Sequence, residues 1–346
     1  MPRVTRRNLT ILPIAATALA VTSKAACAQS PARSAPTSYN EPLGIGLEGW
    51  PYPASVKFLP LAMAGQAVRM AYMDVAPAGP ANGRAAVLLH GKNFDSSYWS
   101  APIGWLTQAG FRVVVPDQIG FNKSSKPDLD YTFEGLAAGT LALLDALALS
   151  TVVLIGHSTG GMLAVRFAAA YPQRIEKLVL EDPIGLVDYR AFIPPQSTET
   201  LVEAERRYTV ETYRAFVAHY FPRLPAAQYE PFVEWRMRMT KSGEFERYAR
   251  ASALTYQMIY RGPVRDLYRV LAMPVLLFAG SEDRSFPLIQ YAPAQTRAGL
   301  PMIPAAAKSA VAELPHGQLV AVPGVGHVPH LEAPDIFRQA LMTFVA

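Results

Sequence analysis

The segment VVLIGHSTGGMLA, residues 152–164, joins a run of apolar β-formers to a Gly-x-Ser-x-Gly pattern and then to small residues. Ser158, at the centre of the pattern, is either a nucleophile or a small residue in a tight turn. A pattern of this kind arises by chance in roughly one chain in ten of this length. A catalytic interpretation therefore requires a base, an acid, an oxyanion hole and a suitable scaffold elsewhere in the chain.

The scaffold is indicated by apolar runs that alternate with helical patterns from about residue 55 onward. The runs that predict strands are residues 68–76, 85–91, 111–117, 151–156, 175–182, 273–280 and 317–324. Helical patterns cover 132–149, 161–172 and 333–345, and a further helix ends at Gly110. Such alternation predicts an α/β fold with a largely parallel sheet.

The stretch 188–262 differs from its surroundings, because it has no strand pattern and is rich in aromatic and charged residues. It predicts several amphipathic helices that form a cap inserted into the sheet domain, which comprises 51–187 and 263–346. We expect most of its aromatic side chains to pack between helices and a few to line a substrate pocket.

The first 28 residues are predicted to be an export signal. A basic start, a short apolar run and the small residues ACA before Gln29 form its three parts. Arg6 and Arg7 before the apolar run resemble a twin-arginine signal, with the general secretory route as the alternative. The apolar run is too short for a membrane span, and Lys24 disfavours a lipoprotein at Cys27. We therefore expect a periplasmic or secreted protein without stable membrane insertion, with residues 29–50 as a linker or loosely held arm.

Removal of that signal changes the global charge. The 346 residues include 32 basic and 27 acidic side chains, but four basic and no acidic ones lie in 1–28. The remaining net charge of +1 gives no reason to expect a nucleic-acid partner. The single cysteine, Cys27, leaves with the signal, so the mature chain can form no disulfide.

Ser158 lies between the strand pattern that precedes it and the helix pattern that follows. A serine at such a sharp turn is exposed above the carboxyl ends of the strands, and the crowded turn requires small neighbours, here Gly156 and Gly160. A serine hydroxyl is a weak nucleophile without a base. Of the six histidines, His327 follows Gly326 in the loop after the last strand and is the predicted base, whereas His330 is expected to be structural.

The base needs a carboxylate that orients it, and two strand-end loops offer one. Asp283 in FAGSEDRSFP is the predicted acid, and Asp182 in LVLEDPIG is the alternative. The oxyanion hole is expected to use two backbone N–H groups. Thr159 supplies one, and Lys92 the other, with Asn93 as the alternative. The Lys92 side chain either reaches solvent or a surface carboxylate, or enters the cleft and favours acidic substrates.

Taken together, the motifs resemble those of the α/β-hydrolase fold, in the capped group that includes esterases and lactonases. The matching segments are LLHGKNF, VVVPDQIGFNKSSKP, GHSTGGMLA, LVLEDPIGL, FAGSEDRSFP and PGVGHVPHLEAP. The resemblance covers about residues 55–346 and implies an eight-stranded sheet, a helical cap and a Ser–His–Asp triad. Haloalkane dehalogenases and epoxide hydrolases share the motif order but carry aspartate where this chain has Ser158. A long insertion between Asp283 and His327 departs from the family pattern.

These features predict an exported serine hydrolase that cleaves an ester, lactone or related acyl bond of a small molecule through an acyl-enzyme. No metal-ligand motif, phosphate-binding loop or dinucleotide fingerprint is present, so we expect neither metal nor cofactor. Two alternatives keep the fold. One is a non-catalytic binding protein, and the other is a cofactor-free haloperoxidase or perhydrolase.

Overall fold

The structure is a computed structural model that describes residues 39–297 and 299–346. The predicted export signal and residues 29–38 of the predicted arm lie outside the described residues.

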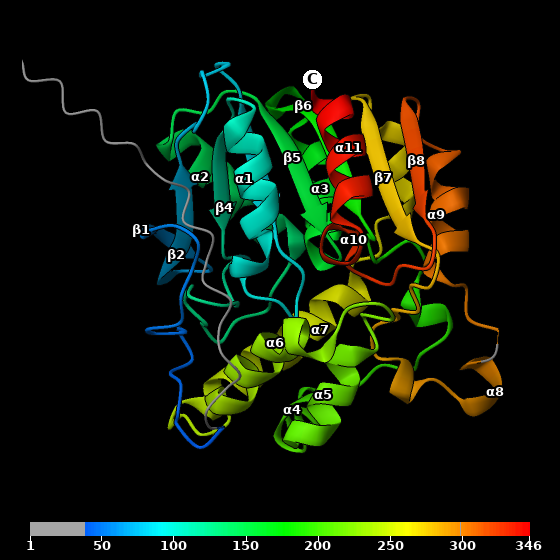
Figure 1. Ribbon diagram of the computed structural model, residues 1–346. Coiled ribbons are helices and arrows are strands. Elements are labelled where there is room, and N and C mark those ends of the chain that lie inside the picture. Colours follow the sequence, from blue (N-terminus) through cyan, green and yellow to red (C-terminus); the bar gives the residue numbers. More distant parts are fainter. Residues whose placement is uncertain (1–38, 298) are drawn as a thin grey trace, which may run out of the picture.

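One mixed sheet of eight strands forms the centre of the molecule (Figure 1). The strands are β1 (Val56–Met63), β2 (Gln66–Val75), β3 (Ala85–Leu89), β4 (Arg112–Pro116), β5 (Val152–His157), β6 (Ile175–Glu181), β7 (Val275–Gly280) and β8 (Gly317–Val322). Their order is β1-β2-β4-β3-β5-β6-β7-β8, with β2 antiparallel to both of its neighbours and the pairs from β4 to β8 parallel. The predicted eight-stranded, mostly parallel α/β fold is confirmed.

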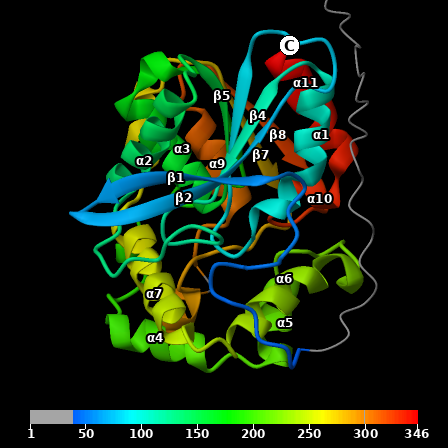
Figure 2. The same ribbon diagram turned by 90° about the vertical axis from the view of Figure 1, so that its left-hand side faces the viewer.

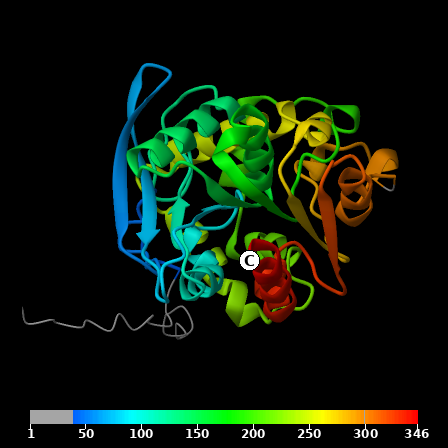
Figure 3. The same ribbon diagram turned by 90° about the horizontal axis from the view of Figure 1, so that it is seen from above.

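Helices cover both faces of the sheet, as the view from above shows (Figure 3). One face carries α1 (Ser100–Gln108) and α11 (Pro334–Val345), and the other carries α2 (Phe133–Ala146), α3 (Thr159–Ala170) and α9 (Ile303–Val311). Because both faces are covered, every residue of β3, β5 and β7 is buried, which explains their continuous apolar runs. Thr132 caps α2 by accepting a hydrogen bond from the Gly135 N–H.

A group of helices between β6 and β7 forms the cap below the sheet in Figure 1. These helices are α4 (Thr198–Arg206), α5 (Val210–Ala218), α6 (Ala226–Met239) and α7 (Phe245–Arg261). Helix α4 packs beside α7, and α5 packs beside α6. The carboxyl ends of the parallel strands point toward this cap (Figure 1), so the loops that follow those strands lie between the two layers. Ligands of open α/β sheets bind at this edge.

The chain before β1 runs down toward α6 (Figure 2). Leu47 is fully buried and Trp50 nearly so, in a cluster with Trp235 and Met239 of α6. The backbone N–H of Leu43 also donates to the carbonyl of Arg238 at 3.2 Å. The segment 29–50 is predicted as a linker or loosely held arm, but its described part, 39–50, instead packs on the cap through apolar side chains.

The insertion between Asp283 and His327 contains two further helices, α8 (Ala294–Arg297) and α9, while α10 (Pro329–Glu332) follows His327. Within 39–297 and 299–346, no helix has the length and apolar character that a membrane crossing requires.

Candidate active site

Ser158 occupies a strained turn between β5 and α3. Its backbone angles, φ 55° and ψ −117°, are rare for a residue with a side chain. The Ser158 N–H donates to the carbonyl of Glu181 at 3.0 Å, which holds the turn against the end of β6. The glycines on either side allow this packing. A Cβ on Gly160 would lie 2.2 Å from the Leu89 carbonyl oxygen, and one on Gly156 would lie 2.4 Å from the Gly160 carbonyl oxygen.

Ser158, His327 and Asp283 form a continuous hydrogen-bonded chain. Ser158 Oγ lies 2.8 Å from His327 Nε2, and His327 Nδ1 lies 2.8 Å from Asp283 Oδ2. An ionised carboxylate can only accept a hydrogen bond, so Nδ1 of His327 carries the hydrogen. Nε2 is then free to accept a hydrogen bond from the serine hydroxyl. Burial opposes ionisation of Asp283, but the charge of His327 and the hydrogen bond from its ring lower the pKa of this carboxyl.

Asp182, the alternative acid, lies beside this chain rather than in it. Its Oδ1 accepts a hydrogen bond from the Gly280 N–H at 2.9 Å, and its side chain is fully buried. The nitrogen of His327 that needs a carboxylate is bonded to Asp283 instead.

The two residues expected to supply the oxyanion N–H groups line the cavity next to Ser158. They are Thr159, at the first position of α3, and Lys92, in the loop after β3. Among the described residues neither N–H has a protein acceptor, as expected of groups that bind a substrate oxygen. The loop lies close to the elbow, since a Cβ on Gly91 would be 3.2 Å from Ser158 Cβ. Asn93, the alternative donor, also lines the cavity.

A buried chain of hydrogen bonds that the sequence analysis missed connects the oxyanion loop to the histidine loop. The Gly91 N–H donates to the Tyr98 hydroxyl at 3.0 Å, and that hydroxyl lies 3.0 Å from His157 Nδ1. His157 Nε2 lies 2.8 Å from the His327 carbonyl oxygen and therefore donates to it. Burial, together with the nearby His327 and His330, lowers the pKa of His157 well below its usual value. A neutral His157 thus links both loops.

The cap contributes Tyr220, which the sequence did not single out. Its ring stacks on the His327 ring with centroids 5.1 Å apart, and its carbonyl accepts from the His327 N–H at 2.9 Å. The Tyr220 hydroxyl in turn accepts from Asn93 Nδ2 at 3.0 Å. Sequence offered no signal for this residue, because the direction in which a cap side chain points depends on how the cap docks.

The Lys92 side chain lines the cavity and does not reach a surface carboxylate as the first predicted placement had it. Its ammonium lies against α7 and donates to Ser252 and Thr255 over 2.7–3.0 Å. It also lies 4.0 Å from the centre of the Tyr256 ring. Burial lowers the pKa of Lys92 to about 7, although the charge of Glu205 opposes the shift. Three polar acceptors and an aromatic face explain why the cation stays within the protein.

Three further histidines, His330, His90 and His219, lie near the site without belonging to the triad. His330 lies 2.8 Å from Glu181 and stacks on Trp99, which agrees with a structural role. His90 accepts from the Gln118 N–H at 3.0 Å beneath the oxyanion loop. His219 lines the cavity and lies 3.5 Å from the carbonyl oxygen of Arg284.

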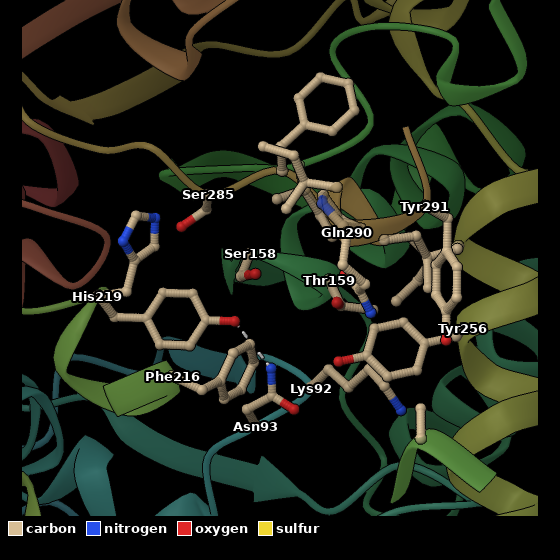
Figure 4. A pocket seen from close by; sticks show the side chains of 18 of the residues that line it. Lys92, Asn93, Ser158, Thr159, Phe216, His219, Tyr256, Ser285, Gln290 and Tyr291 are labelled. Carbon is tan, nitrogen blue, oxygen red and sulfur yellow. Dashed lines mark hydrogen bonds between the residues drawn. The ribbon is translucent and has the colours of Figure 1, made fainter. Parts of the chain in front are cut away.

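A cavity of about 870 Å³ opens above Ser158, between the sheet edge and the cap (Figure 4). Thr159, Ser285 and Lys92 are seen around Ser158 in this view. The hydroxyls of Thr159 and Ser285 are buried and have no hydrogen-bond partner among the described residues. Aromatic rings supply much of the wall, namely Tyr208, Phe216, Tyr220, Tyr256, Phe286 and Tyr291.

Asp182, Asp283 and His327 are close enough to surround a metal ion, since their ligand atoms lie within 4.8 Å of one another. Hydrogen bonds already use His327 Nδ1, both oxygens of Asp283 and one oxygen of Asp182. We therefore interpret this group as part of the hydrogen-bonded site rather than as a metal centre.

Comparison with known proteins places the chain in a family. The sequence profile of the alpha/beta hydrolase fold matches residues 86–334. The chain belongs to the α/β-hydrolase fold family. Among solved structures, a probable hydrolytic enzyme from Pseudomonas aeruginosa PAO1 is 39% identical, with a TM-score of 0.86, and the match covers 89% of this chain and 100% of that one.

Two curated relatives in the α/β-hydrolase comparison match shorter segments. A 2-hydroxy-6-oxo-6-phenylhexa-2,4-dienoate hydrolase of Comamonas testosteroni is 35% identical over 39% of this chain and 49% of its own length. A haloalkane dehalogenase of Mycolicibacterium paratuberculosis is 35% identical over 46% of this chain and 48% of its own length. The chain thus spans about half the length of these curated relatives.

Proposed function

We propose that the protein is a serine hydrolase that cleaves an ester, lactone or related acyl bond through a covalent acyl-enzyme. The observation that supports this most strongly is the hydrogen-bonded chain Ser158–His327–Asp283, with both contacts at 2.8 Å, at the floor of a large cavity. The hydrolase names of the relatives support the reaction class. The site contains serine where hydrolytic dehalogenases of this fold carry aspartate, which disfavours halide displacement.

In the proposed reaction, Ser158 Oγ attacks the carbonyl carbon while its proton passes to His327 Nε2. The negative charge on the carbonyl oxygen is held by the N–H groups of Thr159 and Lys92. The protonated His327, stabilised by Asp283, then gives its proton to the leaving oxygen, and the acyl group remains on Ser158. Water, deprotonated by His327, attacks this acyl-enzyme, and the returning proton restores the serine hydroxyl.

The lining of the cavity supports a substrate with a sizeable aromatic or apolar part. Six aromatic rings in the wall offer stacking and apolar contact, and the volume exceeds the needs of a short acyl chain. Thr159 and Ser285 also line the cavity beside Ser158, and their hydroxyls are buried without a partner among the described residues.

We also propose export through the twin-arginine route. Its support is the Arg6–Arg7 pair before a short apolar run. Fractionation of cells that express the full chain tests this proposal, with Arg6→Lys plus Arg7→Lys as the variant. Loss of the periplasmic or secreted fraction is expected, and unchanged export would favour the general secretory route.

The experiment that tests the enzymatic proposal compares wild type with Ser158→Ala on a panel of p-nitrophenyl esters. The panel includes aryl and long-chain acyl groups, together with lactones and the phenylhexadienoate after which one relative is named. Loss of the nucleophile should lower kcat by at least about 10³-fold on every accepted substrate. Equal, negligible turnover by both proteins would instead favour a binding protein. Halide-dependent peroxidation that requires Ser158 would favour a haloperoxidase.

A further inference from the structure

A second buried carboxyl group lies directly beside the acid of the proposed triad. Asp182 follows β6 and Asp283 follows β7, and these two strands pair in parallel, so both loops leave the same edge of the sheet. Asp182 is fully buried and Asp283 is 1% exposed. One carboxylate oxygen of each aspartate and one ring nitrogen of His327 lie within 4.8 Å of one another, so the charges of the two carboxyls would act on each other at short range.

The hydrogen bonds of the pair are unequal. Asp283 accepts from His327 Nδ1 on one oxygen and from the Ser285 N–H on the other, both at 2.8 Å. Asp182 accepts from the Gly280 N–H through Oδ1, but its Oδ2 is buried and meets no donor among the described residues. If both groups were ionised, two negative charges would face each other out of water. A proton on Asp182 Oδ2 changes that oxygen into a donor and removes the repulsion.

The backbone holds Asp182 in this position. Its φ of 39° is in the left-handed region, which costs a non-glycine residue about 1–3 kcal/mol and persists only where surrounding contacts impose it. Its N–H donates to the Phe278 carbonyl at 3.0 Å, so the residue is fixed to β7 at the main chain as well as at the side chain. The carboxyl therefore stays close to Asp283.

We propose that Asp182 is a positioning residue that carries a proton and donates a hydrogen bond from Oδ2 to the Asp283 carboxylate. This inference rests on the proposed function of the site. The donor fixes the rotation of the Asp283 carboxylate and keeps one negative charge, rather than two, behind His327. His327 is thereby oriented by one carboxylate. A second negative charge would raise the pKa of His327 and slow the transfer of its proton to the leaving group.

The direction of the pKa shift of Asp182 agrees with a protonated carboxyl. Burial raises the pKa of Asp182 well above its usual range, and the charge of Asp283 raises it further. Glu181, the last residue of β6, also raises the pKa of Asp182, while its own carboxylate is bonded to His330. Around Asp283 the remaining groups are His327 and the hydroxyls of Tyr189 and Tyr220. The side chain of Arg284 is 65% exposed and turns toward Glu282.

Two substitutions separate a neutral donor from a charged acid. Asp182→Asn keeps the shape and an N–H donor but cannot ionise. Its kcat/KM should stay within about threefold of wild type, and the midpoint of the acidic limb of the pH profile should not move. Asp182→Leu removes the donor, so Asp283 should hold the proton on His327 more strongly. That limb should then move upward by roughly half to one pH unit, and kcat should fall by about tenfold.

If Asp182 is instead ionised in the wild type, Asp182→Asn removes a negative charge next to His327. The acidic limb would then move downward by about one pH unit or more, which overturns the proposal. A loss in Asp182→Asn as large as that in Asp283→Asn also overturns it, because Asp182 would then be the triad acid.

A spectroscopic measurement tests the proton without any need for turnover. At pH 8 the infrared spectrum of the protein, labelled with ¹³C-aspartate, should show the carbonyl stretch of a buried protonated carboxyl. Asp182→Asn should remove this band. Asp95→Asn is the matched control, because burial raises the pKa of Asp95 only to about 6 and it is ionised at this pH. Absence of the band in wild type, or its persistence in Asp182→Asn, contradicts the proposal, and inactivity toward all acyl substrates leaves this test intact.

Discussion

Gly160 is the position at which a single methyl group should disturb both the nucleophile turn and the oxyanion hole. A Cβ there would lie 2.2 Å from the Leu89 carbonyl oxygen and 2.7 Å from that of His90. An ordinary contact is 3.4 Å or more, so the end of β3 must move by about 1 Å. Lys92, which supplies one proposed oxyanion donor, follows within three residues and would move with it.

The expected magnitude follows from that displacement. A misplacement of about 1 Å in a catalytic group costs about 10²-fold in rate, similar to the loss of one oxyanion donor. Gly160→Ala should therefore lower kcat by about 10²-fold with a smaller change in KM. Crowding of this kind costs about 1–3 kcal/mol, so the unfolding midpoint should fall by roughly 2–10 °C.

Steady-state kinetics on the best ester and thermal unfolding by circular dichroism measure both effects. Gly104→Ala in α1 is the matched control, since a Cβ there meets nothing within 4 Å and alanine favours helix by about 1 kcal/mol. The control should keep its activity and unfold at the same or a higher temperature. Wild-type kcat together with an unchanged midpoint in Gly160→Ala would refute the reasoning about the crowded elbow.

Two further predictions concern residues at the cap. Tyr220→Ala removes the ring stacked on His327 and should lower kcat by roughly tenfold. Tyr220→Phe keeps the ring, so its kcat should stay within about threefold of wild type, and equal losses in both variants would contradict the role of stacking. Burial lowers the pKa of Lys92 to about 7, so between that pH and its usual 10.5 the unfolded chain binds the additional proton and stability rises with pH. The stability of wild type relative to Lys92→Met, measured by urea unfolding, should rise by roughly 1–3 kcal/mol from pH 6.5 to 9.5, and a constant difference would show that Lys92 is not perturbed.

The fold could be predicted from the sequence because the residue patterns of strands and helices are local. Buried parallel strands such as β5 and β7 appear as continuous apolar runs. A helix start is marked by a capping residue, such as Thr132 before α2, whose side chain accepts from a backbone N–H of the first turn. The loops after these strands converge at one sheet edge, so chain order indicated Ser158 and His327 and left Asp283 or Asp182 as the acid. The structure places Ser158, His327 and Asp283 in hydrogen-bond contact.

The parts of the site that sequence did not indicate depend on tertiary packing. Tyr98 and His157 are ordinary core residues by pattern, and only the approach of three loops makes them a hydrogen-bonded link. Tyr220 reaches His327 because of how the cap docks. The acceptors of the Lys92 ammonium could not be predicted either, since no local rule indicates that α7 supplies them.

The most direct test of the account is covalent labelling of the nucleophile. Wild-type protein is treated with a fluorophosphonate, digested and examined by peptide mass spectrometry. The account predicts one adduct, on Ser158, that is lost in Ser158→Ala, after heat denaturation and on prior incubation with a good ester substrate. Folded wild-type protein that remains unlabelled, or a label that persists in Ser158→Ala, would contradict the claim that Ser158 is an activated nucleophile.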